Sequence, residues 1–280
     1  MNHEALRELL RAKRRSIWPQ HAGLAPRPKP GLYQDEVAAL LHVSVQTYRR
    51  LEQGQLRIPA IDFLAHVARL LNFSEVEWAD LCRYARDCDP PHPIRSNSGQ
   101  EVPAEWGEFI SGIPHPAWVT DQSWNVLAYN QAWAAVFESG TPPANHMAWM
   151  LLDPAARTDT LLDWDTYWLP NVLVELRAAC DALKDDPKLR EINHAVRNDP
   201  LVGPRYASLP RAHTSTDGDH RPLRHHQLGD VWVTLLSSMP SDSPRARFGG
   251  LIMQPSRPSG QRRTLKAPRH HAPHSAISAP

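Results

Sequence analysis

The chain has 280 residues, with 31 basic and 30 acidic side chains and a net charge of +1. This length is enough for two domains with cores of their own. No apolar run approaches the ~20 residues that a membrane-spanning helix needs, and the basic run Arg11–Arg15 interrupts the N-terminal region too early for a signal peptide. Three cysteines exclude a disulfide framework. We therefore expect a cytoplasmic protein with no membrane partner.

The charges are distributed unevenly along the chain. Residues 11–57 contain nine Lys or Arg side chains against three Asp or Glu, whereas residues 101–200 contain six against fifteen. A basic block beside an acidic one predicts one module that faces DNA and one that stays away from it.

The first amphipathic pattern covers residues 4–15 and predicts a helix with Leu6, Leu9 and Leu10 on its inner face. Its basic end suits contact with DNA phosphates, but a solvated helix end stabilised by the helix dipole accounts for the same charges. Both interpretations stay open. Residues 18–30 contain four prolines and the basic side chains of Arg27 and Lys29. They predict an irregular arm that reaches a neighbouring groove or backbone.

Residues 34–54 predict two short helices joined by a tight turn. The first helix should cover about residues 34–41, and the second should begin after Ser44, whose hydroxyl can cap the free backbone N–H groups of the first turn. Gly54 should end the second helix, because glycine adopts the left-handed conformation without penalty. Two helices joined in this way form a helix-turn-helix, whose second helix usually enters the major groove.

The exposed face of the second helix carries side chains that read bases. With Tyr48 and Leu51 turned inward, the outward side chains are Val45, Gln46, Arg49 and Arg50. Gln pairs with adenine, Arg with guanine, and Val contacts the methyl group of thymine. Periodicity alone predicts a solvated polar helix face equally well.

Seven positions here form a recognisable pattern: Gln34, Val43, Ser44, Tyr48, Leu51, Glu52 and Gly54. They make residues 4–86 resemble the lambdoid-repressor (Cro/XRE) helix-turn-helix domains. The resemblance implies an all-α, five-helix, lambda-repressor-like domain over residues 1–86. It also implies that Val45, Gln46 and Arg50 reach base edges, and that Gln34 and Ser44 hold phosphates.

The character of the chain changes after a linker rich in proline, at residues 87–103. We expect a hairpin at 117–120 and 124–129, then helical stretches to about residue 196, with Pro170 bending or breaking the middle one. Strands should follow near 221–226, 231–238 and 247–253. This order predicts an α+β, PAS-like domain over residues 104–254. Residues 255–280 have almost nothing to bury and should form a disordered tail.

An ordered set of strings makes the second domain resemble the ligand-binding domain of MmyB-like transcription regulators. The set comprises P-A-W-V-T-D at 116–121, W-N-V-L-A-Y-N at 124–130, L-L-D-P-A-A-R at 151–157, D-W-D at 163–165, V-E-L-R-A-A at 174–179, D-D-P-K-L at 185–189 and L-R-H-H-Q-L-G-D at 223–230. The chain departs from the family pattern at Pro210, where a tryptophan is usual. The ligand therefore need not be the one typical of the family.

Eight of the ten tryptophans lie in this domain, and large aromatic and thioether side chains can line an adaptable apolar pocket. The resemblance implies a small apolar ligand, with an acyl chain as one candidate, and we expect no other cofactor. At most single positions, core packing is the better explanation of these residues. The candidate walls are Trp118, Leu127, Met147, Met150, Leu173 and Leu176.

Catalytic and metal sites are not expected. No set of nucleophile, base and orienting group is readable, and there is no glycine-rich phosphate loop. Cys82, Cys88 and His92 match no zinc spacing. The histidines at 213, 220, 225 and 226 lie in a setting of turns and strands, where solvated or core histidines are the expected interpretation.

These patterns together predict a transcription regulator that binds DNA, does not act as an enzyme, and responds to a small apolar ligand. A homodimer is expected because one helix reads few bases, with half-sites ~34 Å apart. The alternative is a ligand-independent repressor whose C-terminal domain only dimerises.

Overall fold

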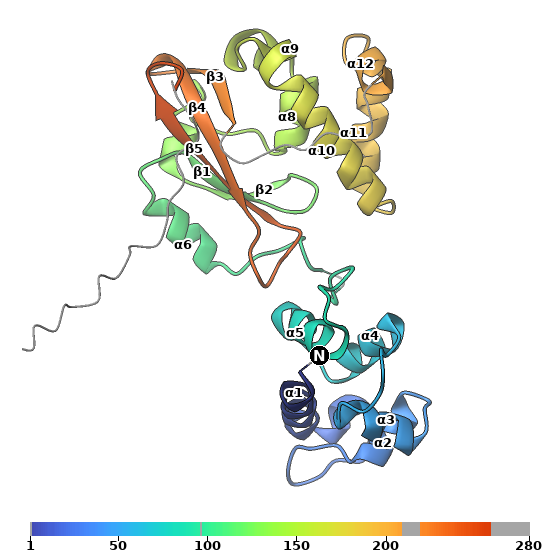
Figure 1. The fold of residues 1–280 in the computed structure, drawn as a ribbon. Helices are drawn as coiled ribbons and strands as arrows, with labels where there is room; N and C mark the ends of the chain where they lie inside the picture. The colour runs from blue at the N-terminus through green and yellow to red at the C-terminus, as the bar shows by residue number, and fades with distance from the viewer. Residues whose placement is uncertain (1, 96, 209–218, 259–280) are drawn as a thin grey trace, which may run out of the picture.

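The computed structural model describes residues 2–95, 97–208 and 219–258. It contains a helical N-terminal domain and a C-terminal domain built on a sheet, joined by a single segment of chain (Figure 1). In these three ranges, no helix is long and apolar enough to cross a bilayer. The expected tail largely falls at 259–280, outside the described residues, as do Pro210 and His213.

The N-terminal domain has the five expected helices. They are α1 (His3–Ser16), α2 (Gln34–Leu40), α3 (Val45–Glu52), α4 (Ile61–Leu70) and α5 (Glu75–Arg86), with a 3₁₀ turn at Pro19–Ala22. The capping residues act as their sequence predicts. The Ser44 hydroxyl accepts a hydrogen bond from the Thr47 backbone N–H at 3.0 Å. Gly54 has a φ of +70°, so the chain leaves α3 through the left-handed region.

The core of this domain lies between α1, α3, α4 and α5. Leu10, Tyr48, Leu64 and Trp78 are completely buried there. Because Tyr48 and Leu51 both enter this core, the opposite side of α3 must face outward.

The segment expected to be a linker is anchored at both ends. On the N-terminal domain, the Glu75 carboxylate accepts hydrogen bonds from the backbone N–H groups of Ile94 at 3.0 Å and Arg95 at 2.9 Å. On the C-terminal domain, the Gly99 carbonyl accepts from the Gln122 N–H at 2.5 Å. Composition predicted a domain boundary here, but not these attachments.

The C-terminal domain is built on one antiparallel sheet with strand order β2-β1-β5-β4-β3. The strands are β1 (Ala117–Thr120), β2 (Val126–Tyr129), β3 (His220–His225), β4 (Gly229–Ser238) and β5 (Arg247–Gln254). This sheet, with the helices inserted between β2 and β3, confirms the α+β fold class.

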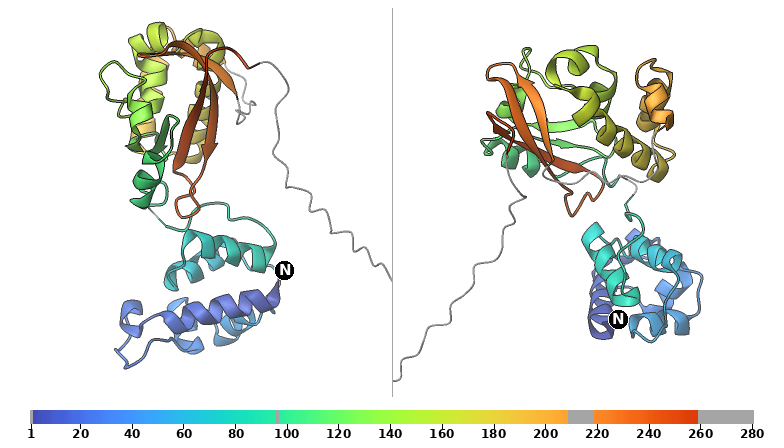
Figure 2. Two further views of the ribbon diagram at one scale, coloured as in Figure 1. Left: turned by 90° about the vertical axis from the view of Figure 1, so that its left-hand side faces the viewer. Right: turned by 45° about the horizontal axis from the view of Figure 1, so that its top comes forward.

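Helices cover both faces of the sheet, as Figures 1 and 2 show. Helix α6 (Glu105–Ser111) packs against β1 and β2, with Ile110 buried against Ala117 and Val119. The opposite face carries the main core and the remaining helices. These are α7 (Gln131–Ala134), α8 (His146–Leu152), α9 (Trp164–Tyr167), α10 (Leu169–Ala182), α11 (Pro187–Asn198) and α12 (Gly203–Ser208), with a π turn at Ala156–Thr160.

The middle helical stretch is broken next to Pro170, as expected. Pro170 lies in the first turn of α10, where a backbone N–H has no partner within the helix and the fixed φ of proline fits the helical conformation. The predicted helical stretch is therefore divided at Trp168.

Trp118 lies across the sheet because the residue opposite it is glycine. In the register of β1 and β5, Trp118 faces Gly249, and a Cβ at Gly249 would be 2.4 Å from Cε2 of the indole. Any side chain at this position must displace a ring that packs against Trp133 and His146.

We expect Gly249→Ala to lower the free energy of unfolding of the C-terminal domain by about 1–3 kcal/mol, because overpacking forces the indole out of its site. Urea unfolding followed by tryptophan fluorescence measures this loss. The control is Gly250→Ala, whose added Cβ would be 3.6 Å from the nearest atom, the Pro116 carbonyl oxygen. Equal losses in the two variants would contradict the packing argument.

Candidate functional site

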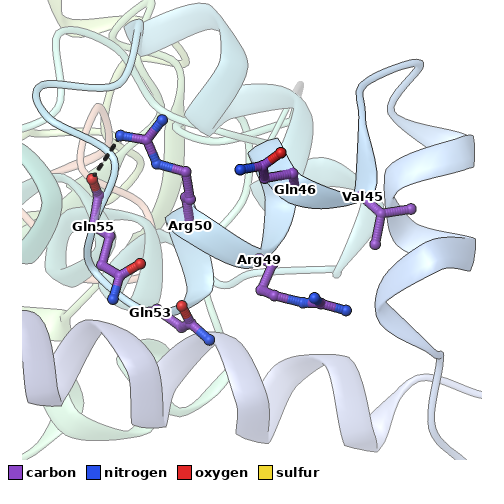
Figure 3. A pocket seen from close by; sticks show the side chains of 6 residues that line it. All are labelled: Val45, Gln46, Arg49, Arg50, Gln53 and Gln55. Carbon is purple, nitrogen blue, oxygen red and sulfur yellow. Dashed lines mark hydrogen bonds between the residues drawn. The ribbon is translucent and has the colours of Figure 1, made fainter.

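The outward side of α3 presents four side chains to solvent. Val45, Gln46, Arg49 and Arg50 are all exposed and, with Gln53 and Gln55, line an open depression (Figure 3). We call these four residues the recognition face. Arg50 donates a hydrogen bond to the Gln55 carbonyl at 3.4 Å, which leaves most of the guanidinium available. The outward positions predicted from periodicity are confirmed.

Gln34 and Ser44, the positions expected to hold phosphates, flank the recognition face. Ser44 is exposed at the start of α3, where its hydroxyl also pairs with the Thr47 hydroxyl at 2.8 Å. Gln34 is half-buried, and its amide donates to Glu52 at 3.0 Å while its oxygen accepts from Nε of Arg49 at 3.4 Å. Gln34 therefore links the buried interior of the domain to the recognition face.

Glu52 is a buried carboxylate at the centre of this network. Arg14 donates to both of its oxygens, at 2.8 and 3.0 Å, and Nε of Arg11 lies 3.3 Å from it. Its side chain is completely buried. Burial by itself raises the pKa of Glu52, but the hydrogen bonds and charge of Arg14 and the hydrogen bond from Gln34 outweigh burial and hold the pKa below its ordinary value.

The basic end of α1 lies beside the recognition face. A shallow groove is lined by Arg11, Arg14 and Arg15 on one side and by Val45 and Arg49 on the other. This arrangement favours the phosphate-contacting interpretation of the α1 charges. The Arg27 side chain, expected in an irregular arm, pairs with Glu36 and stacks on the Tyr33 ring at 4.5 Å.

A cavity of about 360 Å³ lies in the C-terminal domain, between the inner face of the sheet and helices α8 and α10. Its walls are mostly aromatic. They include Trp118, Trp124, Trp133, Trp149, Trp168 and Met150. A hollow of this size, with apolar walls and a few polar groups, is typical of small-molecule sites.

Two of the six predicted wall residues line this cavity, Trp118 and Met150. Met147, Leu173 and Leu176 are fully buried and belong to the core behind it. The prediction for Leu127 was wrong, because this side chain is 41% exposed and lies on β2, an edge strand of the sheet. An apolar side chain in a strand near the cavity does not have to line it.

Polar wall residues were missed in the sequence. His146, Glu175, Arg221 and Arg247 all line the cavity. Burial lowers the pKa of His146 to about 3, so its imidazole is neutral. Burial also lowers the pKa of Arg221 and of Arg247, while the negative charge of Glu175 opposes that shift. Only the alternation along β3 and β5, which turns both arginines inward, could have identified them.

The comparisons with known families divide the chain into the same two domains as the structure. Residues 5–81 match a helix-turn-helix domain, and residues 102–265 match the MmyB-like transcription regulator ligand binding domain. The second match covers more than half of the chain. The chain belongs to the MmyB-like transcription regulators. No curated protein is significantly similar to it.

Two of the histidines of this regulator have hydrogen-bond partners within the fold. His220 pairs with the Thr234 hydroxyl at 2.8 Å, and Nδ1 of His225 accepts from the backbone N–H groups of Gln227 and Leu228 in the turn after β3. Across the ranges that the structure covers, no group of three His, Cys, Asp or Glu side chains is arranged to hold a metal ion.

We expect Glu52→Gln to lower the local stability of the helix-turn-helix by about 3 kcal/mol at pH 7, because it leaves Arg14 without its buried partner. The folded-state pKa of Glu52 lies below its ordinary value of 4.5. Its stabilising contribution is therefore present above that pH and is lost as the pH falls below it. Hydrogen exchange of α1–α3 measures the local free energy.

The difference between Glu52→Gln and the parent should accordingly shrink from pH 7 to pH 3.5. The control is Asp89→Asn, which removes a carboxylate that is 77% exposed and pairs with Arg83 at the surface. This substitution should change the local free energy of unfolding by less than about 1 kcal/mol. If the destabilisation by Glu52→Gln grew at low pH, Glu52 would not be the ionised partner of Arg14.

Proposed function

We propose that this regulator reads DNA through the recognition face of α3 and that a small molecule in the C-terminal cavity controls this binding. The cavity carries the proposal, because it is a ligand-sized hollow with tryptophan walls inside the domain that matches the ligand-binding family. The proposal assigns no catalytic step to the chain and places its action on double-stranded DNA in the cytoplasm.

The chemistry of the recognition face supports major-groove reading. Arg50 and Arg49 suit the O6 and N7 acceptors of guanine, Gln46 suits adenine, and Val45 suits the methyl group of thymine. Gln34, Ser44 and the basic end of α1 flank this face, where they would contact phosphates and set the register. This division of contacts supports a helix-turn-helix of the Cro/XRE type.

The cavity walls support a ligand with an apolar body. Indole rings provide broad apolar surfaces, and Met150 adds an adaptable thioether. A ring system or an acyl chain would fill such a space. The hairpin, the helical cap and the returning antiparallel strands support a PAS-like sensor domain.

The anchored linker provides a route from the cavity to the DNA-binding domain. Arg247 of the cavity wall follows the β4–β5 loop, in which Ser243 donates to the Glu101 carbonyl at 2.6 Å and Arg245 packs against Gly99. The other end of the segment is held by Glu75 of α5. In a homodimer, a ligand with different affinities for two loop positions would change the spacing of two recognition helices.

We expect Arg50→Ala to relax base preference at one position of each half-site and to weaken specific binding by about 1–3 kcal/mol. Selection of binding sites from a random DNA library, followed by sequencing, measures this preference. The matched control is Arg69→Ala, which removes an exposed charge of α4. An unchanged motif for Arg50→Ala would overturn the proposed register of α3.

We expect the purified protein to retain a small molecule, or to acquire one from a cell extract, in native mass spectrometry. The extra mass should vanish on denaturation, because only the folded domain encloses the cavity. The mass of the complex in the same spectrum shows whether the protein is a dimer. Absence of any bound mass, together with full DNA binding by the apo dimer, would favour a ligand-independent repressor whose C-terminal domain only dimerises.

A further inference from the structure

Buried polar atoms without a hydrogen-bond partner gather around the cavity. In the described residues, five of its wall side chains carry such atoms: Oγ1 of Thr120, Nε1 of Trp133, Nε2 of His146, Nε and Nη2 of Arg221, and Nη1 of Arg247. Most buried polar groups in proteins are paired, and an unpaired one costs ~1–3 kcal/mol. Such a concentration in a single hollow indicates a partner that enters it.

The charged groups favour a negative partner. Arg221 and Arg247 contribute two positive charges to the wall, against one carboxylate, Glu175. Among the described residues, no salt bridge joins Glu175 to either guanidinium. Asp219 forms an ion pair with Nη2 of Arg221 at 3.7 Å. Within the part of the chain that the structure describes, no salt bridge joins a carboxylate to Arg247. Arg247 is therefore the cation of the wall with the least compensation.

Thr120 and Arg247 form a ready-made pair of donors. They are directly opposite each other in the register of β1 and β5, so both side chains point to the same face of the sheet. Residues paired in this way have Cβ atoms ~5 Å apart, which brings a hydroxyl and a guanidinium within reach of one group. Arg247 also stands over the Trp124 ring at 3.8 Å, which fixes its position.

We propose that the ligand is an organic anion whose carboxylate or phosphate is held by Arg247 and Thr120. This inference rests on the proposed ligand-binding function and adds the chemical class of the ligand. The apolar body of the ligand lies among the tryptophans. It carries acceptor atoms of its own, because the donors of Trp133 and Arg221 would stay unpaired against a plain hydrocarbon tail.

A matched pair of fluorescent probes tests the anion site. The probes are 1-anilinonaphthalene-8-sulfonate and N-phenyl-1-naphthylamine, which share a ring system and differ by the sulfonate. The full-length protein is first freed of any co-purified ligand on a hydrophobic exchange resin. We expect the sulfonate to bind about 10-fold more tightly or better, since a hydrogen bond to a charged group has this effect.

Variants assign this preference to the two residues. Arg247→Gln should abolish the preference for the sulfonate and leave the affinity for the neutral amine within about 2-fold, which also shows that the cavity has folded. Thr120→Val keeps the shape of the side chain and should weaken the sulfonate several-fold, so it tests the site even if Arg247→Gln does not fold. The control is Arg190→Gln, an exposed arginine of α11, which should keep the preference.

Displacement of the probe identifies the head group. If 1-naphthoate displaces it better than 1-naphthyl phosphate, the natural ligand is a carboxylate, and the reverse order indicates a phosphate.

The outcomes separate the two proposals. Equal affinity of the parent protein for both probes, or a preference that persists in both Arg247→Gln and Thr120→Val, would overturn the anion site and leave an apolar ligand cavity in place. Binding of neither probe would overturn the ligand cavity itself. Loss of the preference in Arg190→Gln as well would reveal surface binding and also overturn the assignment.

Discussion

The buried carboxylate of Glu52 fixes the geometry on which DNA recognition depends. A buried charge is tolerated only when it is paired and fully hydrogen-bonded, so α1 must bring Arg14 to it and α2 must bring Gln34. The same constraint places the basic end of α1 beside the recognition face and holds Gln34 against Arg49. A residue that never meets solvent therefore holds the recognition face in place.

The C-terminal domain contains the opposite arrangement. Around Glu52 most polar groups find partners within the chain, whereas in the cavity Thr120, Arg221 and Arg247 expose unpaired atoms to a hollow. Buried polar groups that are all hydrogen-bonded make a fold rigid. Buried polar groups without hydrogen bonds are costly, and a bound partner can satisfy them. This contrast separates the two parts of the regulator, since one supplies a preset surface and the other a site that the proposed ligand would complete.

The connecting segment is hydrogen-bonded to both the DNA-binding domain and the C-terminal domain. Its hydrogen bonds to Glu75 and to Ser243 attach it to α5 on one side and to the β4–β5 loop on the other. Gly99 is required here because its φ is +84° and because a Cβ would be 2.3 Å from the Cβ of Arg245. Arg247 lies only two residues after Arg245, which packs against Gly99. A change in the position of Arg247 can therefore reach the linker over a short piece of chain.

Local patterns in the sequence determined the elements and the exposed face of α3. Periodicity assigned Tyr48 and Leu51 to the core. Ser44 and Gly54 marked the helix ends, because helix capping and the left-handed conformation of glycine depend only on residues adjacent in the sequence. Tertiary structure alone decided the rest. The cavity joins Thr120 to Arg247 across 127 positions of the sequence through strand register, which no local pattern encodes. Leu127 was misassigned for the same reason, since apolar character does not say which strand lies at an edge.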